Sequence, residues 1–129
     1  MSSILVIEDQ DDLRIHLVDL FRGCSYDVDG AADGQVAVEL LDDKVYDLVL
    51  TDLRLGHQVD GLDLLDYVKE RHPDTEVIIM TAYGSVEGGV VAIQRGAYDY
   101  LTKPFREPEV LQLVRRALGR GASRAAVRD

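Results

Sequence analysis

The sequence is poor in the residues that disulfide-bonded, membrane-spanning and nucleic-acid-binding domains need. Its single cysteine, Cys24, cannot form a disulfide within the chain, which predicts a reducing, cytoplasmic location. No apolar run approaches the roughly 18 residues required to cross a membrane. Lys and Arg number 14 against 24 Asp and Glu, whereas a nucleic-acid-binding domain needs a basic face. We therefore expect a soluble domain that binds neither a membrane nor nucleic acid.

Histidine is also scarce, and His16, His57 and His72 lie too far apart to have the spacing of a zinc site. What is present is a chain of 129 residues, 47% of them hydrophobic, which is enough for one domain with a sizeable core. We assign that domain to residues 1–118. Residues 119–129 have no apolar period and are rich in Gly, Ala, Ser and Arg, so a linker or frayed tail is expected there.

Five short apolar runs alternate with five segments of helical periodicity. The strands are predicted at residues 4–7, 26–32, 45–52, 77–80 and 98–101. Strict alternation implies a parallel sheet covered by helices on both faces. Right-handed crossovers leave few topologies, and the common one at this size has strand order 2-1-3-4-5. The predicted fold is therefore α/β, a doubly wound five-stranded parallel sheet of the flavodoxin-like (βα)5 type.

The fourth predicted helix has an unusual composition. Val86, Val90 and Ile93 recur at helical spacing, but Gly88 and Gly89 stand between them. Each glycine costs a helix roughly 1 kcal/mol relative to alanine. This helix is therefore predicted to be the least stable of the five and the easiest to shift.

Polar residues follow the predicted strands at their carboxyl ends. The first strand is followed by Glu8 and Asp9, the third ends in Asp52, the fourth in Thr81, and Lys103 follows the fifth. The carboxyl ends of parallel strands lie at one edge of the sheet, where α/β folds bind their ligands. Three carboxylates repel one another unless a cation is present, and an all-oxygen site suits Mg²⁺.

These residue types are the parts needed to form and hold an aspartyl phosphate. Asp52 supplies a carboxylate nucleophile, Lys103 an ammonium and Thr81 a hydroxyl donor. Each has an ordinary structural alternative: Thr81 as a β-branched strand residue, Lys103 as part of a turn. One of the acids at positions 9, 11 and 12 is expected to cap the first helix. The functional interpretation is favoured because all five residues fall at carboxyl ends of strands.

The sequence resembles the receiver domain of two-component response regulators from Ile4 to about Leu118. The motifs that carry the resemblance are Ile7-Glu8-Asp9, Thr51-Asp52-Leu53, Thr81-Ala82-Tyr83 and Leu101-Thr102-Lys103-Pro104-Phe105. The run from Gly96 to Phe105 is similar to receivers of σ54-dependent (NtrC-type) transcriptional activators.

The resemblance implies a phosphoprotein that catalyses only its own phosphorylation and dephosphorylation. Asp52 would accept a phosphoryl group from a sensor histidine kinase, and Thr81 and Lys103 would bind the phosphoryl oxygens. The implied Mg²⁺ ligands are Glu8, Asp9, Asp52 and the backbone carbonyl of Arg54. The Lys103–Pro104 peptide bond is expected to be cis.

The resemblance also implies a switch. Thr81 would move toward the phosphoryl group and Tyr100 would turn inward behind it, changing the face made by the fourth helix, fifth strand and fifth helix. We expect this face to form a phosphorylation-dependent homodimer. The expected output is transcription through a separate effector domain. The alternative is a stand-alone regulator or phosphorelay intermediate that acts by protein contact.

Two rival classes fit the sequence less well. A haloacid-dehalogenase-type phosphatase needs a second Asp two residues after the nucleophile, and this chain has Arg54 there. A flavodoxin-like FMN carrier needs a Ser, Thr and Gly-rich loop after the first strand, but residues 8–12 are acidic. The sequence departs from the receiver pattern in the loop from Arg54 to Gly61, which is one residue longer than usual and lacks the usual proline.

Overall fold

The computed structural model describes residues 1–55, 59–82 and 86–128, so Tyr83 and His57 lie outside the described residues. The strands are β1 (Ser3–Ile7), β2 (Asp27–Ala31), β3 (Leu48–Asp52), β4 (Glu76–Thr81) and β5 (Asp99–Thr102). The helices are α1 (Asp11–Gly23), α2 (Gly34–Asp43), α3 (Gly61–Arg71), α4 (Val86–Gln94) and α5 (Glu107–Arg128).

The strands form one parallel sheet in the order β2-β1-β3-β4-β5, which confirms the predicted fold. Strands β1 and β4 are buried along their whole length, as expected for a parallel sheet covered on both faces. The register pairs Ile7 with Thr51, and Thr81 with Thr102. The carboxyl ends of four strands therefore lie level at one edge.

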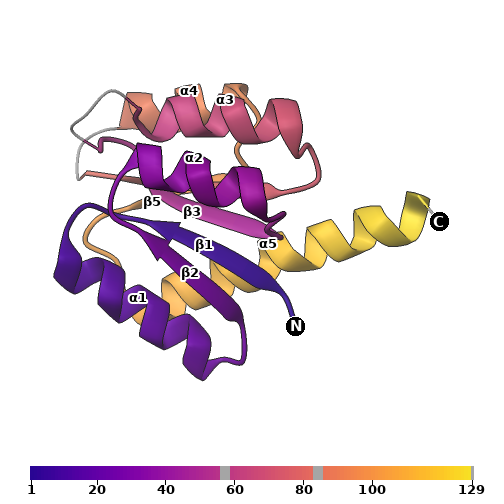
Figure 1. Ribbon diagram of the computed structural model, residues 1–129, viewed down its shortest axis with the longest axis horizontal. Helices are drawn as coiled ribbons and strands as arrows, with labels where there is room; N and C mark the ends of the chain where they lie inside the picture. Colours follow the sequence, from indigo (N-terminus) through magenta and orange to yellow (C-terminus); the bar gives the residue numbers. More distant parts are fainter. Residues whose placement is uncertain (56–58, 83–85, 129) are drawn as a thin grey trace.

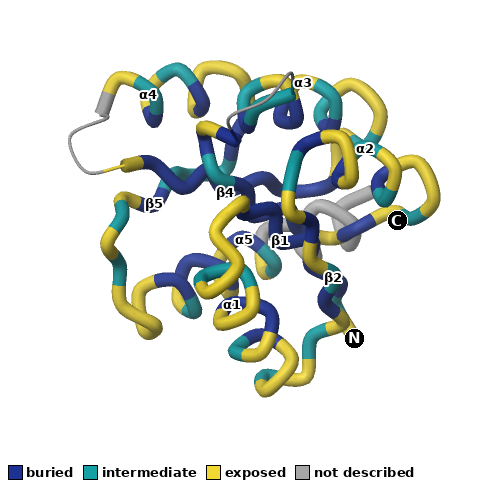
Figure 2. The backbone as a smooth tube through the Cα atoms, turned by 60° about the vertical axis from the view of Figure 1, so that its left-hand side comes forward, coloured by how far each residue is buried: buried dark blue, intermediate teal, exposed yellow. Residues whose placement is uncertain are grey.

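Helices cover both faces of the sheet. Figure 1 shows α2, α3 and α4 on one face and α1 with α5 on the other. Because successive strand residues point to opposite faces, Leu5 and Ile7 pack under α2 and α3 while Ile4 and Val6 pack against α1 and α5. The tube in Figure 2 is buried along the central strands, whereas the helices alternate between buried and exposed positions. Within the described ranges, no helix is long and apolar enough to span a membrane.

Helix α1 begins without the side-chain cap that was expected. Its N-cap residue is Gln10, whose side chain makes no capping hydrogen bond. Asp11 and Asp12 lie in the first turn instead, where their charges interact favourably with the helix dipole. The acids that precede the helix are thus not needed to begin it.

Helix α4 presents two of its large apolar residues, Val90 and Ile93, to solvent. Val90 is 46% exposed and Ile93 is 41% exposed, while Gly89 and Ala92 face the sheet. The regular spacing of valine and isoleucine therefore predicted the helix correctly. However, two of these residues, Val90 and Ile93, lie on its solvent-facing side and not on its buried side. After the helix, Gly96 has φ +107° and its N–H donates to the carbonyl of Ile93, as expected for a glycine that ends a helix.

Helix α5 continues to Arg128 instead of ending near Leu118. Figure 1 shows the helix running past the end of the sheet. Ala117 is fully buried, whereas among the described residues nothing beyond the adjoining turns of the same helix lies within 4 Å of where a Cβ on Gly119 would lie. A helix anchored by packing can extend into good helix formers such as Ala and Arg. Residues 119–128 are therefore helical, and the domain boundary at 118 stays a prediction.

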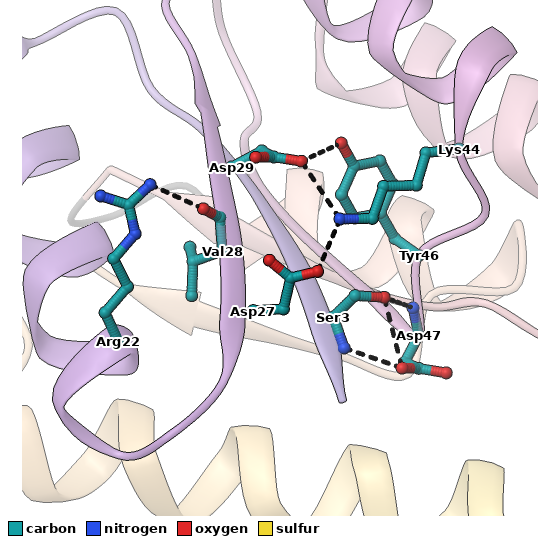
Figure 3. Close-up of polar contacts among 8 residues, drawn as sticks. All are labelled: Ser3, Arg22, Asp27, Val28, Asp29, Lys44, Tyr46 and Asp47. Carbon is teal, nitrogen blue, oxygen red and sulfur yellow. Dashed lines mark hydrogen bonds and ion pairs between the residues drawn. The ribbon is translucent and has the colours of Figure 1, made fainter. Parts of the chain in front are cut away.

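Polar contacts lie on both sides of β2, the strand at the end of the sheet (Figure 3). The phenol of Tyr46, which is 1% exposed, donates to Asp29 Oδ2 at 2.6 Å. Lys44 Nζ lies 2.7 Å from Asp27 Oδ2 and 3.5 Å from Asp29 Oδ2. The guanidinium of Arg22 donates a hydrogen bond to the backbone carbonyl of Val28. Charged groups placed in this way oppose pairing of the edge with another strand.

The Tyr46–Asp29 hydrogen bond is expected to contribute measurably to stability. Replacing Tyr46 with phenylalanine keeps the ring in the core but removes the donor. Asp29 keeps Lys44 as a partner, so the loss should be about 1 kcal/mol in the free energy of unfolding. Urea unfolding of Tyr46→Phe, Asp29→Ala and the double variant would give the coupling between the two groups. Strictly additive effects would show that the hydrogen bond contributes nothing.

Candidate functional site

Three carboxylates meet at the carboxyl edge of the sheet. Glu8 and Asp9 follow β1, and Asp52 ends β3, the neighbouring strand. Each offers a carboxylate oxygen within 4.8 Å of those of the other two. Glu8 is fully buried, Asp52 is 14% exposed and Asp9 faces solvent. The site therefore has a buried acid on one side and open access on the other, and its all-oxygen donor set fits a hard cation such as Mg²⁺.

Lys103 bridges two of these acids. Its Nζ lies 2.5 Å from Glu8 Oε1 and 2.9 Å from Asp52 Oδ2. Burial raises the pKa of Glu8, and the charge of Asp52 adds to the rise, while the hydrogen bond from Lys103 opposes it. Burial alone would lower the pKa of Lys103, but its hydrogen bonds to both acids outweigh that effect and raise it. The ammonium of Lys103 is therefore held in its charged form beside Asp52.

Thr81 brings a hydroxyl to the same edge from β4. It is 1% exposed, and among the described residues its Oγ1 is buried without a hydrogen-bond partner. The backbone carbonyl of Thr81 accepts from the Lys103 N–H at 2.7 Å, which fixes the end of β4 against the segment that follows β5. A buried hydroxyl without a partner is uncommon and costly. Its position suits a donor to a ligand in the site.

The site opens into a cavity of about 260 Å³. Its lining residues are Gln10, Asp52, Leu53, Arg54, Ala82 and Lys103. Arg54 is exposed at this opening. A second cavity, of about 440 Å³, lies between α1 and the segment after β5 and shares Gln10, Ala82 and Lys103 with the first. Asp52 is thus accessible from outside through a cavity large enough for a phosphoryl group.

Two residues that sequence reasoning missed hold the acidic loop. Arg14 on α1 donates to the backbone carbonyl of Glu8 at 2.8 Å and to Asp11 Oδ1 at 2.6 Å. The backbone N–H of Gln10 donates to Glu8 Oε2 at 3.1 Å. Neither contact could be predicted from the sequence, because both depend on how the loop turns from β1 into α1.

The loop after β3 returns directly against Asp52. A Cβ on Gly61 would lie 2.2 Å from the backbone oxygen of Asp52, so only glycine fits there. The N–H of Gly61 donates to the carbonyl of Leu53 at 2.9 Å. Asp60 then caps α3 in a capping box with Asp63. The loop, which the sequence predicts to be one residue longer than the receiver pattern, is anchored at both ends.

Tyr100 lies near the site on β5. Its partner in the register is Ile79, two residues before Thr81. The ring is half-buried and packs against the core under α3 and α4. Beyond β5, the Lys103–Pro104 peptide bond is cis, in agreement with the expectation. The structure thus brings all the predicted site residues to one edge of the sheet, with Tyr100 at its flank.

A model of the response regulator receiver domain matches residues 4–115. The chain belongs to this family. The receiver is 40% identical over 114 residues to the response regulator protein PilR of Pseudomonas aeruginosa, covering 88% of this chain and 25% of PilR. It is 38% identical over 115 residues to the DNA-binding transcriptional regulator NtrC of Escherichia coli K12, covering 89% of this chain and 24% of NtrC.

A crystal structure of NtrX from Brucella abortus matches the receiver with a TM-score of 0.94 and 34% identity, covering all of this chain and 29% of that one. These relatives confirm the predicted resemblance to NtrC-type response regulators of two-component systems. The chain spans about a quarter of the length of the curated relatives it matches. Receiver domains are signalling modules that interact with histidine kinases and bind Mg²⁺ at an acidic pocket, and this chain has such an acidic cluster.

Proposed function

We propose that the receiver accepts a phosphoryl group on Asp52 from a phosphohistidine of a sensor histidine kinase. The observation that carries the proposal is the position of the Asp52 carboxylate, accessible at the sheet edge and 2.9 Å from the ammonium of Lys103. An Asp52 oxygen attacks the phosphorus atom, the phosphorus–nitrogen bond breaks, and the imidazole, protonated on its other ring nitrogen, leaves with the electron pair. The product is an acyl phosphate and a neutral histidine.

The proposed metal site uses groups already at the sheet edge. Glu8, Asp9 and Asp52 would hold Mg²⁺ together with the backbone carbonyl of Arg54. When bound, the ion neutralises charge on the acids and on the phosphoryl oxygens. Glu8 is the most constrained ligand because it is fully buried and its second carboxylate oxygen accepts from the backbone of Gln10.

Lys103 and Thr81 are proposed to hold the transferred group. The ammonium of Lys103 lies on the Asp52 side of the cavity and offers a charge-assisted hydrogen bond to a phosphoryl oxygen. The Oγ1 of Thr81 is buried without a partner in the described parts of the chain and offers a second donor. The receiver would then catalyse only its own phosphorylation and the later hydrolysis.

The proposed output is a change in the surface made by α4, β5 and α5, called here the output face. Movement of Thr81 toward a phosphoryl group leaves space that Tyr100, on the neighbouring strand, can fill. The exposed Val90 and Ile93 give the output face an apolar patch on α4. We propose that a second copy of the receiver covers this patch after phosphorylation. Similarity to NtrC, a DNA-binding transcriptional regulator, supports a transcriptional output in a cytoplasmic protein.

Acetyl phosphate with Mg²⁺ tests the proposal without the cognate kinase. The receiver should gain the mass of one phosphoryl group, and EDTA should prevent the gain, because the acids cannot accept a dianionic donor without a cation. Intact-mass spectrometry over time measures both. Equal labelling in EDTA would contradict the proposed metal site, and absence of labelling with Mg²⁺ would contradict the phosphoacceptor function.

A further inference from the structure

The larger of the two cavities lies beside the phosphoryl site but has no role in the transfer described above. It measures about 440 Å³ and lies between α1, the segment after β5 and the first turn of α5. Most of its lining is apolar and consists of Leu13, Leu17, Leu20, Pro104, Phe105 and Val110. Leu17 and Val110 also belong to the hydrophobic core that packs against this face of the sheet. The cavity therefore offers an apolar surface that is held in place by the core.

The two cavities meet at three residues that line both of them, Gln10, Ala82 and Lys103. Lys103 Nζ lies 2.9 Å from Asp52 Oδ2, and Asp52 lines only the smaller cavity. A phosphoryl group beside Asp52 and Lys103 would thus stand next to the junction. A group bonded to that phosphoryl group can extend from the junction into the larger cavity.

The charges around the larger cavity favour a ligand that is anionic at one end only. Among the described residues that line it, Lys103 is the only lysine or arginine, and it lies at the junction. Farther along α1, His16 Nε2 lies 2.7 Å from Glu107 Oε2 on α5, so these two polar groups are paired with each other. Glu107 would repel a second negative charge. The part of the ligand away from the phosphoryl group should therefore be uncharged and apolar.

The volume of the larger cavity exceeds what an acetyl group can fill. An apolar cavity of about 150 Å³ is enough to hold a benzene ring. The cavity here, of about 440 Å³, has room for a short alkyl chain. Acetyl phosphate carries a single methyl group beyond its carbonyl and would leave most of this apolar surface uncovered. A donor with a longer chain would cover more of it.

We propose that the larger cavity is a subsite for the alkyl chain of an acyl phosphate, which makes short-chain fatty acyl phosphates preferred small-molecule donors. This inference rests on the proposed function of Asp52. An Asp52 oxygen attacks phosphorus, the bond between phosphorus and the acyl oxygen breaks, and the fatty carboxylate leaves with the electron pair. The products are the aspartyl phosphate and a free carboxylate anion, and no proton is transferred.

Butyryl phosphate should label the receiver faster than acetyl phosphate at equal, subsaturating concentrations with Mg²⁺. The two leaving carboxylates have nearly the same basicity, so the donors differ mainly in two methylene groups. Each methylene group that leaves water strengthens binding roughly fourfold, and incomplete burial of the chain reduces the expected gain in rate to about tenfold. Intact-mass spectrometry over time measures both rates. Equal or slower labelling by butyryl phosphate would overturn the inference, as expected if a side chain of a protein partner occupies the cavity instead.

Leu20→Gln tests the wall of the cavity. Leu20 lines the larger cavity but not the one at Asp52, and glutamine keeps the length of the side chain while making it polar. The ratio of the butyryl to the acetyl rate should fall about threefold or more. Leu40→Gln is the matched control, since Leu40 is also a half-buried helical leucine but lies on α2 across the sheet. An unchanged ratio in Leu20→Gln, or an equal fall in both variants, would overturn the inference.

Pentylphosphonate locates the chain without any transfer, because its phosphorus–carbon bond does not release the group to Asp52. Its alkyl chain matches butyryl phosphate in length. With Mg²⁺, methyl NMR of the wild type should show shifted resonances for Leu13, Leu20 and Val110 and an unshifted one for Leu40. Methylphosphonate, which has no chain to enter the cavity, should shift none of them.

These measurements separate the inference from the proposed function. If no donor labels the wild type, the proposed function fails and the inference fails with it. If acetyl and butyryl phosphate label the wild type equally and pentylphosphonate leaves the methyl resonances of Leu13, Leu20 and Val110 in place, only the inference fails. Faster labelling by butyryl phosphate together with shifts confined to these three residues is the result that the inference predicts.

Discussion

Asp52→Asn is expected to abolish phosphoryl transfer to the receiver while leaving the fold intact. The amide has nearly the shape of the carboxylate but is not a nucleophile toward phosphorus. Its removal of one charge should not destabilise the chain, because Lys103 keeps Glu8 as a partner at 2.5 Å. It also relieves the repulsion by which Asp52 raises the pKa of Glu8. Mass spectrometry after incubation with acetyl phosphate and Mg²⁺ should show no labelled species.

Asp29→Asn provides a control with the same chemical change outside the site. Asp29 lies on β2 and pairs with Tyr46 and Lys44, so its substitution should change stability slightly and leave labelling at the wild-type rate. Circular dichroism and thermal unfolding confirm that both variants are folded. Labelling of Asp52→Asn at the wild-type rate would place the acceptor elsewhere.

Beryllofluoride with Mg²⁺ is expected to convert the receiver from monomer to dimer, raising its sedimenting mass roughly twofold. Beryllofluoride stands in for the phosphoryl group on Asp52 and would draw the hydroxyl of Thr81 toward it. The shift of Tyr100 then changes the output face around Val90 and Ile93, which are both more than a third exposed. Coupling of about 1–3 kcal/mol is typical for such two-site systems. Sedimentation equilibrium measures the association constant in each condition.

Substitutions test separately the switch role of Tyr100 and the contact made by the output face. Tyr100→Ala should lose the response to beryllofluoride because the link between the site and the output face is gone. Ile93→Ser should weaken the dimer directly. Ile15→Ser is the matched control, since Ile15 is also an exposed helical isoleucine, 55% exposed, but lies on α1 across the sheet. A wild type of equal mass in both conditions would remove the dimer proposal, and an intact response in Tyr100→Ala would remove its role as a switch.

The topology and the site could be predicted because both follow from features local in sequence. Continuous apolar runs mark strands that are buried on both faces, and their alternation with helices fixes a parallel sheet. Once the sheet is parallel, residues at the carboxyl ends of strands must share an edge. Glu8, Asp52 and Lys103 come from three strands, yet their meeting required only that topology.

What could not be predicted depends on contacts between distant residues. Spacing identified α4 but could not tell that Val90 and Ile93 face outward, because the buried side consists of Gly89 and Ala92. Helix propensity marked Gly88 and Gly89 as a weakness, whereas glycine is required there because Leu53 and Tyr100 leave no room for a Cβ. Arg14 has no local signal for its contact with the Glu8 carbonyl.

The end of α5 shows a different limit. The absence of an apolar period beyond residue 118 predicts a segment without a core-facing stripe, but it does not decide the backbone conformation. The helix continues to Arg128 because each added turn follows one already formed. Likewise, the many acids near the start of α1 made a capping aspartate the natural expectation, yet Gln10 occupies that position and Asp11 follows it in the first turn.

The most direct test of the central claim is chemical mapping of the phosphoryl group. An acyl phosphate on aspartate is reduced by borohydride to homoserine, which survives digestion and is located by peptide sequencing in the mass spectrometer. After incubation of the receiver with acetyl phosphate and Mg²⁺, homoserine is expected at position 52 and at no other acidic residue. Reduction at Asp9, seen as homoserine there, or at Glu8, seen as 2-amino-5-hydroxypentanoic acid, is excluded by this account. A reduced residue anywhere but at position 52, or a labelled receiver without homoserine, would contradict it.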